Sequence, residues 1–324
     1  MYILGLQGSP RKGGNTDILL KTFMDAAARA GATVNTIQAA KAGVADCIGC
    51  GYCEKHGTCV ITDDPMATDI YGLMRQAELI VAASPVYFYG VSAQLKKLID
   101  RCQTLWSRKY IYRLKDPMAA TRQGILLSVA ASQGRQLFDG VHLTAKYFFD
   151  AIDARFAHAL TYRGIEAKGD IRHQDGLTAD VDALVKETVH PMLSRKNVLF
   201  LSPEGACRAP LAAAMAQQRF SDRIRTDFAG MEKTTALDET MVRCVQETGL
   251  DLGYRRPQSP EEAFFGLAPD LMVVIGDGPE KDPYPNVERL HWSLPAPQST
   301  DNQSMETLRL QIRANLDQLT NRIR

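Results

Sequence analysis

The 324-residue chain lacks an excess of charge, because 38 lysines and arginines face 37 acidic side chains and leave a formal charge of +1. Proteins that bind nucleic acid or anionic membrane surfaces usually carry a basic patch or a large positive excess. The composition therefore argues against a nucleic-acid partner. Partners have to be recognised by local sites rather than by bulk charge.

Long apolar runs are also missing. No stretch approaches the roughly 18 apolar residues of a membrane span. The first residues, MYILGLQGSP, contain neither the basic segment nor the small-residue cleavage site of a secretory signal. We therefore expect no membrane association and a cytoplasmic location. In that compartment, a chain with seven cysteines favours metal or redox chemistry over disulfides.

Apolar segments alternate with helical patterns over the first half of the chain, which predicts a doubly wound parallel sheet covered by helices. The expected strands are 2–6, 32–38, 78–84, 123–132 and 156–167. The expected helices are 17–30, 92–106, 137–153 and 178–193. This set completes an α/β domain over residues 1–193.

The pattern restarts after Lys196 with an apolar strand, a glycine-bearing turn and an alanine-rich helix. We therefore expect a second α/β domain over residues 194–324. Its predicted elements are a helix to Phe220, strands 225–230 and 270–276, and helices 238–248 and 304–323.

The segment between the first strand and the first helix reads Gly8-Ser-Pro-Arg-Lys-Gly-Gly-Asn-Thr16. A glycine-rich turn before a helix presents backbone N–H groups and a positive dipole end to an anion, so we expect a phosphate site. Ser9, Asn15 and Thr16 offer hydrogen-bond donors, and Arg11 offers a planar fork. The loop has neither the GxxxxGK[ST] nor the GxGxxG spacing of common nucleotide sites. The plainer alternative is an N-cap turn that contains glycine.

A second loop, Ser84-Pro-Val-Tyr-Phe-Tyr-Gly-Val-Ser92, follows the third strand. The carboxyl ends of parallel strands share one edge of the sheet, so this loop should lie beside the phosphate loop. Its aromatic residues offer flat apolar surface that suits a planar ring such as isoalloxazine. An aromatic cluster taken alone favours a core position, but the neighbouring phosphate loop favours a ligand pocket.

These loops, together with CIGCGYC at 47–53 and SPVYFYGVSAQLKKLIDR at 84–101, resemble the flavodoxin-like NAD(P)H-dependent FMN reductases and in particular the iron–sulfur flavoproteins. The resemblance covers about residues 1–193. It implies an FMN phosphate held by Ser9, Arg11, Asn15 and Thr16. It implies a flavin ring lined by Pro85, Val86, Tyr87, Phe88 and Gly90, with residues 131–134, including Ser132, on the other side. It also implies NAD(P)H as electron donor and a homodimer or homotetramer.

Four cysteines crowd into the spacing Cys47-x2-Cys50-x2-Cys53-x5-Cys59. A compact run of this kind offers four thiolates to one [4Fe–4S] cluster, as the resemblance to iron–sulfur flavoproteins also implies. Two alternatives stay open. The thiols can be bare, or they can bind zinc, although two successive x2 spacings are unlike the paired knuckles of structural zinc sites.

Residues 198–210, VLFLSPEGACRAP, resemble the strand, anion loop and helix start of low-molecular-weight tyrosine phosphatases and arsenate reductases. This resemblance covers about residues 197–324 and implies a domain of low-molecular-weight phosphatase type. Ser202 stands at the position of the nucleophilic cysteine, and Arg208 at that of the anion-binding arginine. Cys207 directly precedes this arginine.

The chemistry of that family is expected to be absent here. A serine hydroxyl is far less acidic than the thiol it replaces, and Glu204 aims a carboxylate at an incoming oxyanion. Ala296 takes the place of the acidic residue before a proline, unless Asp282 is aligned there instead. A rescue by Cys207 would put the nucleophile beside the arginine, so that the loop could not wrap an oxyanion between them.

The leading hypothesis is an FMN enzyme that takes hydride from NAD(P)H and passes electrons to a small-molecule or protein acceptor. The alternative is a redox sensor in which the state of the flavin or the cysteines controls the second domain. Arsenate reductase or phosphotyrosine phosphatase activity is the third hypothesis.

Overall fold

The computed structural model describes residues 1–232, 234–276, 283–297, 302–320 and 322–323. The chain forms two compact units, one made of residues 1–113 and 121–193, the other of residues 114–120 and 194–324. Sequence analysis had assigned the short segment 114–120 to the first domain, and the structure corrects this. The segment belongs to the second unit because the backbone of Lys115 forms hydrogen bonds with other residues of that unit. One of them runs from the Lys115 N–H to the carbonyl of Gly249 at 2.8 Å.

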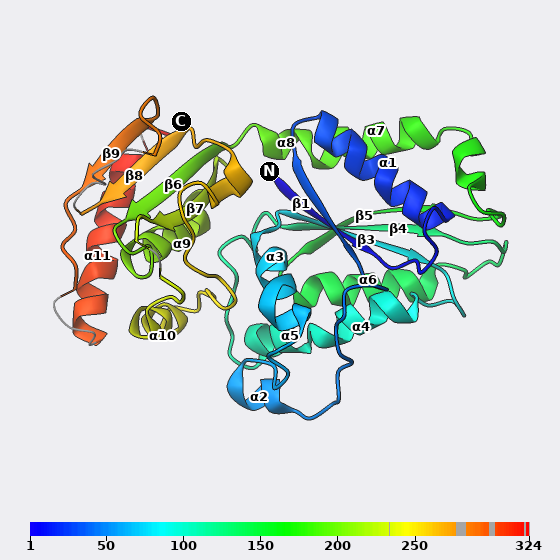
Figure 1. Ribbon diagram of the computed structural model, residues 1–324, viewed down its shortest axis with the longest axis horizontal. Helices are drawn as coiled ribbons and strands as arrows, with labels where there is room; N and C mark the ends of the chain where they lie inside the picture. Colours follow the sequence, from blue (N-terminus) through cyan, green and yellow to red (C-terminus); the bar gives the residue numbers. More distant parts are fainter. Residues whose placement is uncertain (233, 277–282, 298–301, 321, 324) are drawn as a thin grey trace. The chain divides into compact units, whose positions relative to one another are not determined.

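Five parallel strands form the sheet of the first unit, in the order β2-β1-β3-β4-β5 (Figure 1). They are β1 (Tyr2–Gln7), β2 (Thr33–Gln38), β3 (Leu79–Pro85), β4 (Gln123–Val129) and β5 (Arg155–Tyr162). The three central strands are almost fully buried, because helices cover both faces of the sheet. The order 2-1-3-4-5 is that of flavodoxin-like sheets, and the predicted doubly wound α/β class is confirmed.

Figure 1 shows α1 (Asn15–Arg29) and α7 (Leu177–Thr188) on one face of this sheet. The other face carries α3 (Tyr71–Gln76), α4 (Ala93–Arg101), α5 (Gln103–Tyr110) and α6 (Asp139–Ala151). The shorter elements are α2 (Tyr52–His56), the π-helix η1 (Met66–Ile70), the 3₁₀-helix η2 (Asp170–His173) and α8 (His190–Leu193).

Several elements of the first unit differ from the sequence prediction; the expected helix 178–193, for example, is divided into α7 and α8. The expected helix 92–106 is two helices, because the backbone of Cys102 (ψ 0°) departs from helical geometry between α4 and α5. The expected strand 156–167 ends at Tyr162. The residues after Tyr162 leave the sheet and form the loop that leads to η2.

The second unit has a four-stranded parallel sheet in the order β7-β6-β8-β9. Its elements are β6 (Lys196–Ser202), α9 (Arg208–Phe220), β7 (Ile224–Gly230), α10 (Glu239–Glu247), the 3₁₀-helix η3 (Ala263–Gly266), β8 (Leu271–Ile275), β9 (Glu288–Trp292) and α11 (Asn302–Leu319). Alternate residues of β6 fill the two cores. Phe200 packs among the residues of α9, α10 and α11, and Leu201 packs with Phe264 on the opposite face.

The sequence prediction missed β9, whose residues are partly exposed at the edge of the sheet and lack a continuous apolar run. Within the described residues, no helix combines the length and the apolar character that crossing a membrane requires.

Candidate functional site

The loop between β1 and α1 is pressed against β3 at its start. A side chain at Gly8 would come within 2.8 Å of the carbonyl oxygen of Ala83, which instead accepts the Gly8 N–H at 2.7 Å. Ser9 is buried, and its Oγ accepts the N–H of Arg11 at 3.2 Å. Thr16 is buried in the first turn of α1, where N–H groups have no acceptor within the helix. The loop thus gathers hydroxyl and N–H donors at the positive end of the helix dipole.

Asn15 has other side-chain partners than the phosphate that the sequence predicted. Its Nδ2 donates to the carbonyl of Ala167 at 2.9 Å, and its Oδ1 accepts the N–H groups of Gly169 at 2.9 Å and Ile171 at 3.3 Å. The predicted contact of this amide with a phosphate stays a prediction. Asn15 ties the loop that follows β5 to the N-terminus of α1.

The loop after β3 reverses direction within four residues. Tyr87 and Gly90 exchange backbone hydrogen bonds of 3.0 and 2.9 Å, and the two residues between them, Phe88 and Tyr89, have φ of 48° and 62°. Residues other than glycine rarely adopt this left-handed backbone conformation. Strained backbone of this kind is frequent at functional sites. Phe88 is fully exposed, and Tyr87 and Tyr89 are 42% and 53% exposed. The aromatic cluster is therefore a surface turn, and its interpretation as core is wrong.

Three buried serines join the bases of these loops. Ser92 Oγ donates to the carbonyl of Gly8 at 2.6 Å, and Ser84 Oγ accepts the N–H of Ser92 at 2.9 Å. Ser128 Oγ in turn donates to the carbonyl of Ser84 at 2.7 Å. Sequence reasoning missed these positioning residues, although serines at the carboxyl ends of two buried strands and at the N-cap of α4 were a readable signal.

The loop 131–134 after β4 lies next to the aromatic turn. A side chain at Gly134 would approach the Tyr89 hydroxyl to 3.0 Å, and one at Gly140 would approach the Tyr89 carbonyl to 2.3 Å. Ser132 is exposed, and its carbonyl accepts the N–H of Gly164 at 3.3 Å. The carboxyl edge of the sheet therefore carries the residues expected at the flavin, namely Ser9, Arg11, Thr16, Pro85, Val86, Tyr87, Phe88, Gly90 and Ser132.

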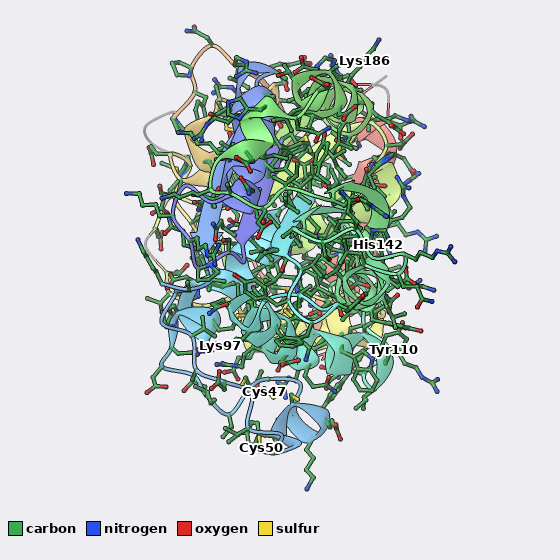
Figure 2. The ribbon with its side chains drawn as sticks, turned by 90° about the vertical axis from the view of Figure 1, so that its right-hand side faces the viewer. Cys47, Cys50, Lys97, Tyr110, His142 and Lys186 are labelled. Atoms are coloured by element: carbon green, nitrogen blue, oxygen red, sulfur yellow. The ribbon has the colours of Figure 1, made fainter. Side chains whose placement is uncertain are left out.

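The four clustered cysteines lie on the loop around α2, at the lower end of the molecule in Figure 2, where Cys47 and Cys50 are labelled. All four line one cavity of about 580 Å³, which residues of α4 and α5 also border. Cys47 and Cys50 are exposed, whereas Cys53 and Cys59 are half-buried. The sequence prediction that these thiols face one space is consistent with this geometry.

A buried arginine of α4 holds both ends of this cysteine loop. Arg101 donates to the carbonyls of Ala45 at 3.0 Å and Ile61 at 3.3 Å, and it forms a two-pronged ion pair with Asp64. Burial alone would raise the pKa of Asp64, but the hydrogen bonds from Arg101 and from backbone N–H groups lower it below its usual value. The carboxylate and the guanidinium therefore both stay charged inside the protein.

A second buried arginine, Arg108 of α5, donates to the carbonyl of Gly57 at 3.0 Å and so holds the middle of the loop. Gly57 has a φ of 67°, which a residue with a side chain would adopt only under strain. Two cations thus border the cysteines. Sequence reasoning did not identify either arginine, since both lie far along the chain from the cysteine motif.

Within the described residues, no three His, Cys, Asp or Glu side chains converge closely enough to hold a single metal ion. This geometry disfavours a preformed zinc site. Each iron of a [4Fe–4S] cluster takes one thiolate, so the four thiols need only surround a shared space. Four cysteines around one cavity fit that group in number and kind of ligand.

In the second unit, neighbouring backbone N–H groups donate hydrogen bonds to the carbonyls of the loop between β6 and α9. The carbonyl of Pro203 accepts the N–H groups of Met231 at 2.7 Å and Glu232 at 2.8 Å. The carbonyl of Ala206 accepts the N–H of Asp238 at 3.0 Å. Neighbouring backbone therefore fastens the loop from outside and fixes its conformation.

The arginine of this loop is also engaged. Arg208 is buried, and its Nη1 donates to the carbonyl of Leu294 at 2.9 Å. A side chain at Gly276 would come within 2.4 Å of the same nitrogen. The guanidinium is thus packed against the segments that follow β8 and β9. Ser202 is buried at the end of β6.

Cys207 is unsuited to act as a nucleophile. Burial, reinforced by the charge of Asp238, raises the pKa of its thiol to about 12. Its Sγ lies 3.9 Å from the sulfur of Met305. A reactive cysteine needs a lowered pKa, so the geometry disfavours the rescue by Cys207.

Two residues, Ala296 and Asp282, can be aligned with the general acid of the phosphatase family. Ala296 is exposed and has no proton to give. Asp282, the alternative, lies outside the described residues. Glu204 is exposed on the loop itself.

Comparison with known proteins matches residues 1–155 to the family model described as NADPH-dependent FMN reductase. An iron–sulfur flavoprotein of Methanocaldococcus jannaschii is 43% identical over 105 residues, which are 32% of this chain and 53% of that protein. The chain thus spans about half the length of this relative. An iron–sulfur flavoprotein of Methanosarcina thermophila is 33% identical over 192 residues, which are 58% of this chain and 90% of that protein.

Two solved structures illustrate what the units are similar to. An FMN-dependent NADH-azoreductase from Bacillus anthracis, in complex with FMN, matches 59% of this chain and all of its own length, with a TM-score of 0.45 and 10% identity. An arsenate reductase from Archaeoglobus fulgidus matches 38% of this chain and 98% of its own, with a TM-score of 0.34 and 22% identity. The sequence relatives carry the assignment: the chain belongs to the iron–sulfur flavoprotein family, with an NADPH-dependent FMN reductase domain over residues 1–155.

Proposed function

We propose that the protein is an FMN enzyme that takes a hydride from NAD(P)H and passes the two electrons to an acceptor. The observation that carries this proposal is the meeting of a phosphate-type loop, an exposed aromatic turn and the loop 131–134 at one edge of the sheet. When bound, FMN supplies a ring that accepts hydride and releases electrons singly or in pairs.

Different residues at this edge of the sheet bind the phosphate and the ring of FMN. The Ser9 and Thr16 hydroxyls and the first-turn N–H groups of α1 hold the phosphate, and the exposed Arg11 adds a positive charge. The turn from Pro85 to Gly90 lines one side of the ring. The loop offers room for one anion and no dinucleotide motif, which supports FMN rather than FAD.

The cysteine loop is proposed to hold a [4Fe–4S] cluster on Cys47, Cys50, Cys53 and Cys59. The relatives named as iron–sulfur flavoproteins and the shared cavity support this. Arg101 holds both ends of the cysteine loop and Arg108 its middle, which keeps the four thiols around one space. Bound to these four cysteines, the group would supply one-electron redox chemistry in the same unit as the flavin loops.

Anaerobic reconstitution with FMN, iron and sulfide tests the proposal. Chromatography of the released cofactor should give FMN, and NADPH or NADH should bleach the flavin absorbance, which returns when ferricyanide is added. Release of FAD, absence of flavin after reconstitution, or bound FMN that neither nicotinamide reduces would overturn it.

We further propose that the second unit has no phosphatase or arsenate reductase activity. Ser202 replaces a thiol nucleophile, the Cys207 pKa is raised, and Arg208 is hydrogen-bonded to the Leu294 carbonyl. The assay is turnover of an aryl phosphate, or of arsenate with a thiol donor, by the full-length protein. Turnover that Cys207→Ser abolishes would contradict this.

A further inference from the structure

The loop after β5 takes an unexpected course. In the sheet order, β3 and β4 separate β5 from β1, yet residues 167–171 lie against the N-terminus of α1. Three hydrogen bonds from the Asn15 side chain hold them there. Figure 1 shows both segments at the same end of the first unit.

This course brings a lysine to the phosphate loop. A Cβ built on Gly13 would lie 3.4 Å from Cε and 3.8 Å from Nζ of Lys168. Gly13 has a φ of 68°, and its bare backbone leaves the lysine this space. The Lys168 ammonium therefore lies beside Gly13, in the middle of the Gly8–Thr16 loop.

The charges around the loop favour an anion. The Asp17 carboxylate accepts the Gly13 N–H at 2.7 Å and brings one negative charge to the first turn. Arg11, Lys12 and Lys168 bring three positive charges to the same loop, and all three side chains are exposed to solvent. Glu166, Asp170 and Arg172 lie close to Lys168 in the chain, so the cations nearest Gly13, and not the net charge of the whole region, favour an anion.

We propose that Lys168 binds the FMN phosphate, and that Asn15 is a positioning residue that holds Lys168 over the phosphate loop. This inference rests on the proposed function, because it assigns two further residues to the same cofactor. It explains why the Asn15 amide forms hydrogen bonds with the backbone of residues 167–171 rather than with the ligand. Lys168 lies outside the GSPRKGGNT motif and is more than 150 residues away in the chain.

The test compares FMN with riboflavin, which has the same ring and no phosphate. Equilibrium affinities are measured by quenching of flavin fluorescence on full-length protein. Lys168→Met should weaken FMN binding by about tenfold, the order expected for one charge-assisted contact, and leave riboflavin binding unchanged. Lys168→Arg should retain most of the FMN affinity.

Lys186→Met is the matched control, because it removes an equal charge from an exposed position in the last turn of α7 (Figure 2). It should change neither affinity. Asn15→Ala should reproduce the loss that is specific to FMN, since it frees the loop that carries Lys168. A general folding defect would instead weaken riboflavin binding as well.

The outcomes separate the two proposals. A wild-type protein that binds neither flavin overturns both the proposed function and this inference. A wild type that prefers FMN, together with a Lys168→Met variant of unchanged preference, overturns the inference alone. Equal losses of FMN and riboflavin in Lys168→Met also overturn it.

Discussion

The two units of this chain begin with the same arrangement, a buried parallel strand, a loop that contains glycine and a long helix, but they use the loop differently. In the first unit, the loop carries the Ser9 and Thr16 hydroxyls next to the N-terminus of α1. The cationic side chain of Lys168 lies beside this loop. In the second unit, hydrogen bonds from neighbouring backbone N–H groups hold the loop in place. Arg208 donates a hydrogen bond to a backbone carbonyl. Both arrangements are stable.

The difference shows that a strand–loop–helix frame alone does not make a site. Donors have to be left for a ligand, and charges of the right sign have to surround them. In the second unit, the loop carries the exposed carboxylate of Glu204, and the raised pKa of Cys207 keeps its thiol un-ionised.

The largest expected effect separates the two groups of cysteines. Changing Cys47, Cys50, Cys53 or Cys59 singly to Ser should remove most of the iron from anaerobically reconstituted protein, because a [4Fe–4S] cluster needs all its thiolates. FMN should stay bound, since the phosphate loop is a separate element. Cys207→Ser is the control and should keep its iron. Iron near zero in the wild type would favour bare thiols.

The second effect concerns the second loop. The wild-type chain should show no measurable turnover of aryl phosphate, because nucleophile and general acid act in the same step and both are replaced. The triple variant Ser202→Cys, Glu204→Gly and Ala296→Asp should stay far below an active phosphatase, since Arg208 keeps its bond to Leu294. Efficient turnover by this variant would show that the loop is free to accept an oxyanion.

The third effect is the pH dependence of thiol alkylation. A Cys207 pKa of about 12 leaves roughly one thiol in ten thousand ionised at pH 8, and the rate should rise about tenfold per pH unit up to that pKa. The exposed Cys47 and Cys50 should react much earlier in protein without a cluster. Mass spectrometry of peptides after iodoacetamide treatment follows each site. Early labelling of Cys207 would contradict its burial.

A smaller effect tests the ion pair that holds the cysteine loop. Arg101→Met leaves Asp64 buried and unpaired and should cost roughly 3–5 kcal/mol of unfolding free energy. Lys97→Met, in the same helix, removes the exposed Lys97–Asp46 pair of 3.2 Å and should cost about 1 kcal/mol or less (Figure 2). Urea unfolding of both variants measures the difference, and equal costs would contradict the account.

The same pair has a pH signature. The Asp64 pKa is lowered in the folded state, so its contribution to stability is complete above the unfolded value of about 3.9 and is lost as pH falls through the folded value. Arg101→Met should remove this acid-side dependence. A wild type and variant with parallel stability curves below pH 4 would show that the pair is not formed.

The sequence predicted the parts of the molecule that depend on local pattern. Strand–helix alternation predicted both parallel sheets, and the glycine-rich and aromatic loops were placed at the correct edge. The clustered spacing predicted that Cys47 and its three neighbours share one space. These features follow from short-range periodicity and from the geometry of parallel strands.

The parts that were missed depend on contacts between distant residues. The sequence predicted a continuous strand over 156–167, whereas the strand ends at Tyr162. The loop that follows and contacts Asn15 was therefore not expected. For the same reason, Asn15 was assigned to the phosphate. Arg101 was read only as part of a family motif, because nothing local indicates that it reaches Ala45 and Asp64.

The most direct test of the central contrast is a pair of matched serine variants, each at the loop of one unit. FMN affinity is measured for wild type, Ser9→Ala and Ser202→Ala by fluorescence titration of the full-length protein. Ser9→Ala should weaken binding by about tenfold, as for loss of one hydrogen bond to a charged group, and Ser202→Ala should leave it unchanged. An unchanged affinity in Ser9→Ala, or an equal loss in Ser202→Ala, would contradict the account.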